Sequence, residues 1–96
     1  MEALFTKMQE YLQMDHEIPF AEFTDYHNQV IALLNADFGE MDKDTLVQVA
    51  GICQIVSINA TARGSRKDAN AKRFKKIAEK AEFWYKAICY KLIKNM

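Results

Sequence analysis

Lysines and two aromatic residues recur along residues 72–94 at a spacing that suits an anionic partner. At 100° per residue, one side of a helix here carries Lys72, Lys75, Lys76, Lys80, Lys86 and Lys94, together with Phe83 and Tyr90. Lysines attract phosphates without regard to sequence, and an aromatic ring among them can stack on an unpaired base. Such rings can equally contact another helix or a second subunit. The residues expected to bind a partner are Lys72, Lys76, Lys80, Phe83, Lys86 and Tyr90.

Two kinds of partner fit this face. A nucleic-acid-binding accessory protein would use its lysines and Phe83, but arginine is scarce, occurring only at positions 63, 66 and 73. The isoelectric point near 6.7 is also far below that of a dedicated nucleic-acid binder. The sequence therefore favours a non-enzymatic interaction or regulatory protein that binds a protein partner, or itself, through its C-terminal helix. Nucleic-acid binding stays the alternative.

Catalytic and metal-binding patterns are weak by comparison. Neither histidine has ligand spacing, and there is no Cys-x-x-Cys, His-x-x-x-His or Glu-x-x-His motif. Two acid pairs at i,i+3 spacing could hold Mg²⁺ if they faced inward, Glu22 with Asp25 and Glu79 with Glu82. Both pairs fall on the side away from the apolar stripe. We therefore expect no catalytic residues, metal, cofactor or small-molecule substrate.

The formal net charge of zero conceals two oppositely charged halves. Residues 1–50 carry two lysines and ten acidic residues, a formal charge of −8, whereas residues 51–96 carry eleven basic and three acidic residues, a formal charge of +8. Such asymmetry is typical of a charged binding region. It is equally expected if acidic and basic helices neutralise each other across a bundle or a dimer.

The apolar periodicity predicts four helices in one domain, residues 1–96. The first spans about 2–14 and ends before Pro19, which suits the first turn of the second. That second helix should end between 35 and 39, with Gly39 as the C-cap. Asp42 or Asp44 can cap a third helix that runs to about residue 63.

The fourth helix is expected to begin at an approximate capping box, Ser65 and Asp68, and to reach about Lys94. Its length of ~43 Å exceeds the ~32 Å diameter of a compact sphere of this mass. The helix should therefore project, bend or meet a partner. The third helix is apolar nearly all round, with a ridge of small or neutral residues that includes Gly51. A homodimer would cover both the overlong fourth helix and the apolar surface of the third.

The overall expectation is an all-α protein, a small antiparallel three- to four-helix bundle with a long C-terminal helix. Met1–Met14 lacks the pattern of a secretory signal, and residues 45–62, although uncharged, are too polar to cross lipid comfortably. The expected location is the cytoplasm, with no membrane partner. Cys53 and Cys89 occupy apolar helical positions and are expected to be reduced and shielded.

Overall fold

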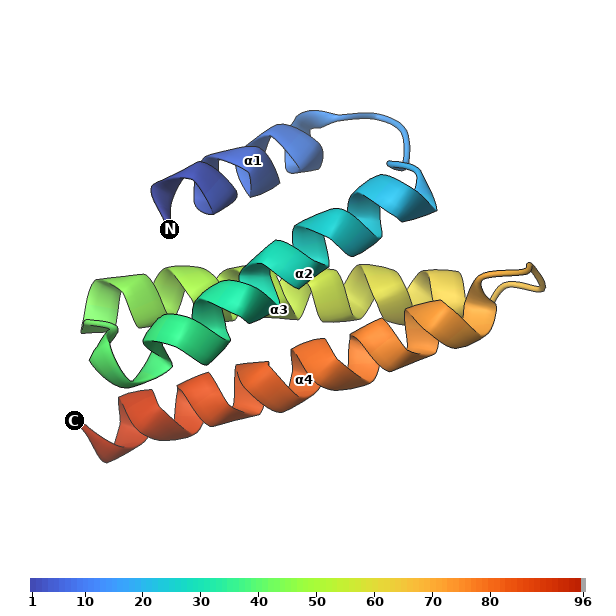
Figure 1. Ribbon diagram of the computed structural model, residues 1–96. Coiled ribbons are helices and arrows are strands. Elements are labelled where there is room, and N and C mark those ends of the chain that lie inside the picture. Colours follow the sequence, from blue (N-terminus) through green and yellow to red (C-terminus); the bar gives the residue numbers. More distant parts are fainter. Residues whose placement is uncertain (96) are drawn as a thin grey trace.

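The computed structural model describes residues 1–95, and they form four α-helices (Figure 1). No strand occurs in this part of the chain, so the prediction of a small all-α bundle is confirmed. The helices are α1 (Glu2–Gln13), α2 (Phe20–Asp37), α3 (Lys43–Gly64) and α4 (Ala71–Lys94), with a 3₁₀ turn, η1 (Phe38–Glu40), between α2 and α3.

The two long C-terminal helices, α3 and α4, lie side by side and antiparallel, and α2 crosses them at an angle (Figure 1). Phe23, Val30 and Leu34 of α2 are buried in this three-helix arrangement. Opposite them are the fully buried side chains of Ile52 on α3 and Phe74 on α4, among others. Each large apolar side chain removed from water in this way contributes about 1.5–3 kcal/mol. These three helices therefore contain the core.

The first helix is attached more lightly. Met8 is its one buried side chain among the described residues. Two tyrosine hydroxyls fix it, because Tyr26 donates to the carbonyl of Leu4 at 2.6 Å and Tyr11 donates to the Glu22 carboxylate at 2.8 Å. Burial and this carboxylate raise the pKa of Tyr11 to about 12. α1 therefore acts as a fourth, peripheral helix.

Local signals set the starts of α2 and α3 as expected. Pro19, with φ −59° and ψ 155°, immediately precedes α2. The Asp42 carboxylate accepts a hydrogen bond from the Thr45 amide at 2.8 Å, which satisfies one free donor at the start of α3. The prediction of an aspartate cap is confirmed at Asp42.

The second helix ends at Asp37, within the expected range of 35 to 39, but two expected caps were wrong. Gly39 lies in the 3₁₀ turn and does not have positive φ, so it is not a left-handed cap. The proposed capping box also fails, since Ser65 donates its hydroxyl to the Ala62 carbonyl and Asp68 accepts from the Asn70 amide. These bonds favour a turn, and α4 begins only at Ala71.

The later start of α4 removes the expected mismatch in length. Its 24 residues span about 36 Å. The molecule measures 42 × 23 × 20 Å, an elongated shape that differs from the sphere assumed from its mass. The 22 residues of α3 run beside α4 for most of this length (Figure 1). The fourth helix therefore fits within its own bundle, and its length is no reason for a partner.

The third helix is covered on several sides but not on all. Val47 and Ile58 remain 54% and 60% exposed, and a Cβ added at Gly51 would meet no atom within 4 Å. No helix in the described chain uses the expected close approach at Gly51. By length and composition α3 could cross a membrane, a criterion that the core helix of a soluble protein also meets.

Candidate functional site

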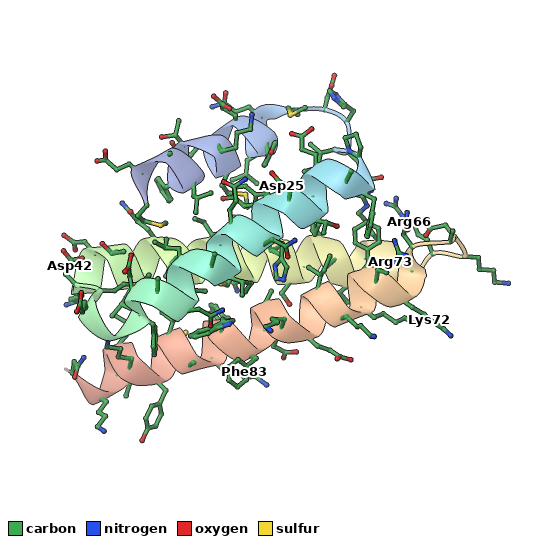
Figure 2. All side chains as sticks on the ribbon, viewed as in Figure 1. Asp25, Asp42, Arg66, Lys72, Arg73 and Phe83 are labelled. Carbon is green, nitrogen blue, oxygen red and sulfur yellow. The ribbon has the colours of Figure 1, made fainter. Side chains whose placement is uncertain are left out.

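The six residues predicted to bind a partner all lie on exposed positions along one side of α4, a set that we call the α4 outer face. Phe83 is 64% exposed and Tyr90 69% exposed. Phe83 points away from the other helices, and Lys72 projects from the N-terminal end of the same helix (Figure 2). Burying even part of two such rings in a partner would contribute substantial binding energy, because aromatic side chains dominate interface energetics. The face consists of Lys72, Lys76, Lys80, Phe83, Lys86 and Tyr90.

One exposed apolar residue next to this face was missed by the sequence reasoning. Ile93 is 68% exposed, three residues after Tyr90 and ten after Phe83. That spacing could have shown that the three side chains share a surface, since residues three and seven apart are neighbours on a helix. The C-terminal half of the α4 outer face is therefore more apolar than expected, and the N-terminal half is cationic.

The rotation of α4 is fixed by Trp84, which turns Phe83 outward. The rings of Phe83 and Trp84 meet edge to face at 5.7 Å, and the indole packs in the same way on Phe38 at 5.3 Å. Lys91 holds Phe38 from the other side, since its ammonium donates to the Phe38 carbonyl at 2.6 Å and lies 4.7 Å from the ring centre. The exposed Phe83 ring therefore rests against Trp84, and Trp84 is itself packed on Phe38.

The positive charge of α4 is not neutralised by pairing with the acidic half of the chain. Within residues 1–95, a single ion pair joins the two halves, between Arg66 and Glu17. Lys86 pairs with Glu82 at 3.3 Å, but both belong to α4. Pairs as exposed as this one contribute little and leave the field of the helix largely intact. Ion pairs within one chain therefore do not account for the charge asymmetry.

Two of the three arginines are hydrogen-bonded within the fold, and the third approaches an aromatic ring. Arg66 makes two hydrogen bonds to the Glu17 carboxylate, at 2.7 and 2.6 Å. Arg63 lies 4.3 Å from the Phe74 ring centre and donates to the Ile18 carbonyl at 2.9 Å. Arg73 lies 5.8 Å from the Phe20 ring centre. The arginines thus tie the start of α2 to the α3–α4 turn, and Figure 2 shows Arg66 and Arg73 at that end.

A groove of about 420 Å³ opens between α1, the segment after it, α2 and α3. Its walls include the apolar side chains of Met8, Leu12 and Ile55. Its polar lining includes Tyr11, which donates to the Glu22 carboxylate, and Arg63, which donates to the Ile18 carbonyl. Asp15 and His16 also line the groove, and their side chains lie 3.4 Å apart and are exposed to solvent.

The remaining titratable groups do not form a second site. No cluster of three or more His, Cys, Asp or Glu residues that could hold a metal occurs in residues 1–95. The Asp25 carboxylate accepts a hydrogen bond from Gln29 on its own helix. His27 is buried, and burial together with the charge of Lys80 lowers its pKa. Burial raises the pKa of the Cys53 thiol to about 12, so this thiol is unreactive.

The sequence and fold were compared with known proteins at three levels. No family model, no curated protein and no solved structure matches the chain.

Proposed function

We propose that this protein is a non-enzymatic interaction module that binds an acidic, amphipathic helix of a protein partner on the α4 outer face. One observation supports the proposal above all: Phe83 and Tyr90 are 64% and 69% exposed on a helix with eight basic and two acidic residues. Exposed aromatic rings within a field of one sign are typical of a surface that becomes covered.

The spacing along the face supports a helical partner. Lys76, Phe83 and Tyr90 are separated by seven residues each, and Ile93 follows three residues later. Seven-residue spacing keeps side chains along one seam between two packed helices. Apolar residues of the partner would pack on the two rings and Ile93, and acidic residues would lie opposite the lysines. The proposed partner helix therefore has apolar residues at seven-residue spacing and acidic residues beside them.

A nucleic acid is the second candidate, and the occupied arginines weigh against it. Arginine provides the bidentate contacts to phosphates and bases that lysine cannot. In this fold the guanidinium groups of Arg63 and Arg66 are hydrogen-bonded to a carbonyl and a carboxylate, so of the three arginines Arg73 alone is without a hydrogen bond among the described residues. Binding would depend on lysines and on two rings about 10 Å apart along the helix, which favours weak, strongly salt-dependent association.

The direct test is a titration of the full chain with two fluorescent probes. One is a helical peptide with leucine at heptad spacing and glutamate at the flanking positions, and the other is a single-stranded oligonucleotide. We expect the peptide to bind and the double variant F83A/Y90A to lose at least about tenfold in affinity, since two ring contacts are removed. Leu12→Ala is the matched control, because Leu12 is 59% exposed but lies on α1.

The charge requirement is tested with a second pair of variants. Lys76→Glu with Lys80→Glu should weaken binding of the acidic peptide, whereas Lys43→Glu, exposed at the start of α3, should not. If the oligonucleotide binds more tightly than the peptide, and its affinity falls steeply as salt is added, the nucleic-acid function is favoured over the protein-binding function. Peptide binding that F83A/Y90A leaves unchanged would contradict the proposed surface.

A further inference from the structure

The basic and the apolar residues of the α4 outer face lie at opposite ends of the helix. Residues 71–80 contain five basic residues and one acidic residue, Glu79, and no large apolar side chain in this segment is exposed. The exposed large apolar side chains of α4 are Phe83, Tyr90 and Ile93, which all follow position 82. A surface divided in this way favours a partner whose acidic and apolar residues are also divided.

The lysines near the start of α4 are also the ones that the fold leaves without a counter-ion. No ion pair within residues 1–95 involves Lys72, Lys76 or Lys80. Towards the end of the helix, by contrast, the Lys86 ammonium pairs with a carboxylate of its own helix at 3.3 Å, and Lys91 donates to a backbone carbonyl at 2.6 Å. Carboxylates of a partner therefore gain most opposite the first three lysines.

The dipole of α4 adds to the positive potential at its start. The helix begins without a side-chain cap, and its first turn has no acidic residue. The free backbone N–H groups of that turn therefore strengthen the positive potential of the lysines. The C-terminal end of any partner helix has negative potential, because its last carbonyl groups are free. An antiparallel partner brings this negative end beside the positive end of α4.

From the divided face, the lysines without a counter-ion and the dipole, we infer that the partner is an antiparallel helix with an apolar N-terminal half and an acidic C-terminal half. This orientation rests on the proposed function, because it concerns the same surface. The apolar half packs on the exposed rings, and the acidic half lies over the lysines near the start of α4. Lys72 and Ile93 are 21 residues apart, which is about 31 Å along the helix. A partner helix of about six turns is therefore long enough to contact both ends of the face.

Two fluorescent peptides of equal composition, each of about 22 residues, test the order of the halves. The apolar-first peptide has leucines at heptad spacing in its N-terminal half and glutamates in its C-terminal half, and the acidic-first peptide has the halves exchanged. Both are stapled on the side away from the contact, so both are helical before binding. We expect the full chain to bind the apolar-first peptide at least about threefold more tightly. Equal affinities, or tighter binding of the acidic-first peptide, would overturn the inference.

A nitroxide label on the acidic end of the apolar-first peptide reports the orientation directly. In the ¹⁵N-labelled chain, the label should broaden the amide signals of Lys72 and Lys76 and leave those of Tyr90 and Ile93 sharp. Broadening at Tyr90 and Ile93 instead would show a parallel helix and would overturn the inference.

Two single variants test the role of the lysines near the start of α4. Lys76 and Lys94 are both exposed on the same side of the helix, 18 residues apart, so they form a matched pair. Lys76→Glu should reduce the preference for the apolar-first peptide, whereas Lys94→Glu should keep it. A preference that Lys76→Glu leaves unchanged would contradict the inferred place of the acidic half.

The peptide with leucine and glutamate along its whole length, which tests the proposed function, separates two kinds of failure. If that peptide binds but the two ordered peptides bind equally well, the inferred orientation is wrong and the proposed function stands. If none of the three peptides binds, the proposed function is wrong, and the inferred orientation is wrong with it.

Discussion

Phe83 and Trp84 are neighbours in the chain, and their rings touch edge to face at 5.7 Å, yet they have different roles in the fold. Trp84 packs on Phe38 and on the core, whereas Phe83 keeps 64% of its surface exposed. Adjacent helical residues lie about 100° apart around the axis, so packing one ring inward turns the other outward. If the proposed function is correct, this division separates stability from binding at two consecutive positions.

Substitution of each ring should show that separation. Trp84→Ala should lower the free energy of unfolding by about 2–4 kcal/mol, somewhat less than for a fully buried ring, because Trp84 is only half-buried. Phe83→Ala should lower it by less than about 1 kcal/mol and should weaken peptide binding. Urea denaturation of both variants measures the difference. Equal losses of stability would mean that α4 is rotated relative to the structure described.

The two glycines of α3 should respond in opposite directions to alanine. A Cβ at Gly64 would lie 2.9 Å from Cγ of Lys75 and 3.3 Å from its backbone nitrogen, so Gly64→Ala should destabilise by about 1–3 kcal/mol. At Gly51 the same group meets nothing, and Gly51→Ala should stabilise by about 0.5–1 kcal/mol through helix propensity. Thermal melts at low protein concentration compare the two. A gain at Gly64 would contradict the close approach of α4.

Stability should fall as the solution becomes acidic, in part because of His27. Burial and nearby Lys80 disfavour the charged ring, so the pKa of His27 lies below its ordinary value of 6.5 in the folded chain. The unfolded chain therefore binds a proton more readily below pH 6.5. The contribution of neutral His27 to the free energy of unfolding is therefore complete above pH 6.5. It is lost as the pH falls from there through the lowered pKa of the folded chain.

Denaturant melts at about pH 7.5 and about pH 5 measure this dependence. His27→Gln should reduce the difference in unfolding free energy between the two pH values. His16→Gln is the control and should not, because the His16 side chain is 68% exposed. The assignment would be wrong if the His16 variant, and not the His27 variant, flattened the profile.

The two cysteines should differ in reactivity. Cys53 is buried, and its thiol pKa is raised to about 12, whereas Cys89 is only half-buried beside Tyr85. The expectation that both thiols are shielded is thus met at Cys53 but not fully at Cys89. A thiol reagent in native buffer should modify Cys89 first and Cys53 only when denaturant is added. Prompt modification of two thiols per chain would contradict the burial of Cys53.

The sequence was sufficient to predict the helices because strong local signals bound them. Pro19 and Asp42 act through their own backbone and side chain, so the starts of α2 and α3 follow from one or two residues. The α3–α4 turn could not be predicted in this way. Ser65 and Asp68 have the residue types of a cap, and only the observed hydrogen bonds to Ala62 and Asn70 show that they form a turn.

The candidate surface was also predictable only in part from the sequence. Helical spacing alone placed Phe83 outside the core, and the structure agrees. Ile93 was missed, although its position three residues after Tyr90 places it on the same side of the helix, where it is 68% exposed. The occupation of the arginines depends on contacts over long separations, such as Arg66 with Glu17 across 49 residues, which no local pattern contains. The surface chemistry that a partner would meet is therefore better defined by the fold than by the sequence.

The most direct test of the α4 outer face is a map of backbone amide shifts in the ¹⁵N-labelled chain during titration with the acidic amphipathic peptide. We predict saturable shifts along α4 that centre on Lys76, Phe83 and Tyr90, with little change in α1 or α3. The F83A/Y90A chain should show the same starting spectrum away from the substitutions and no saturation. Saturable shifts that gather instead around Met8, Leu12 and Ile55 would place binding in the α1 groove, and they would contradict the α4 outer face as the site.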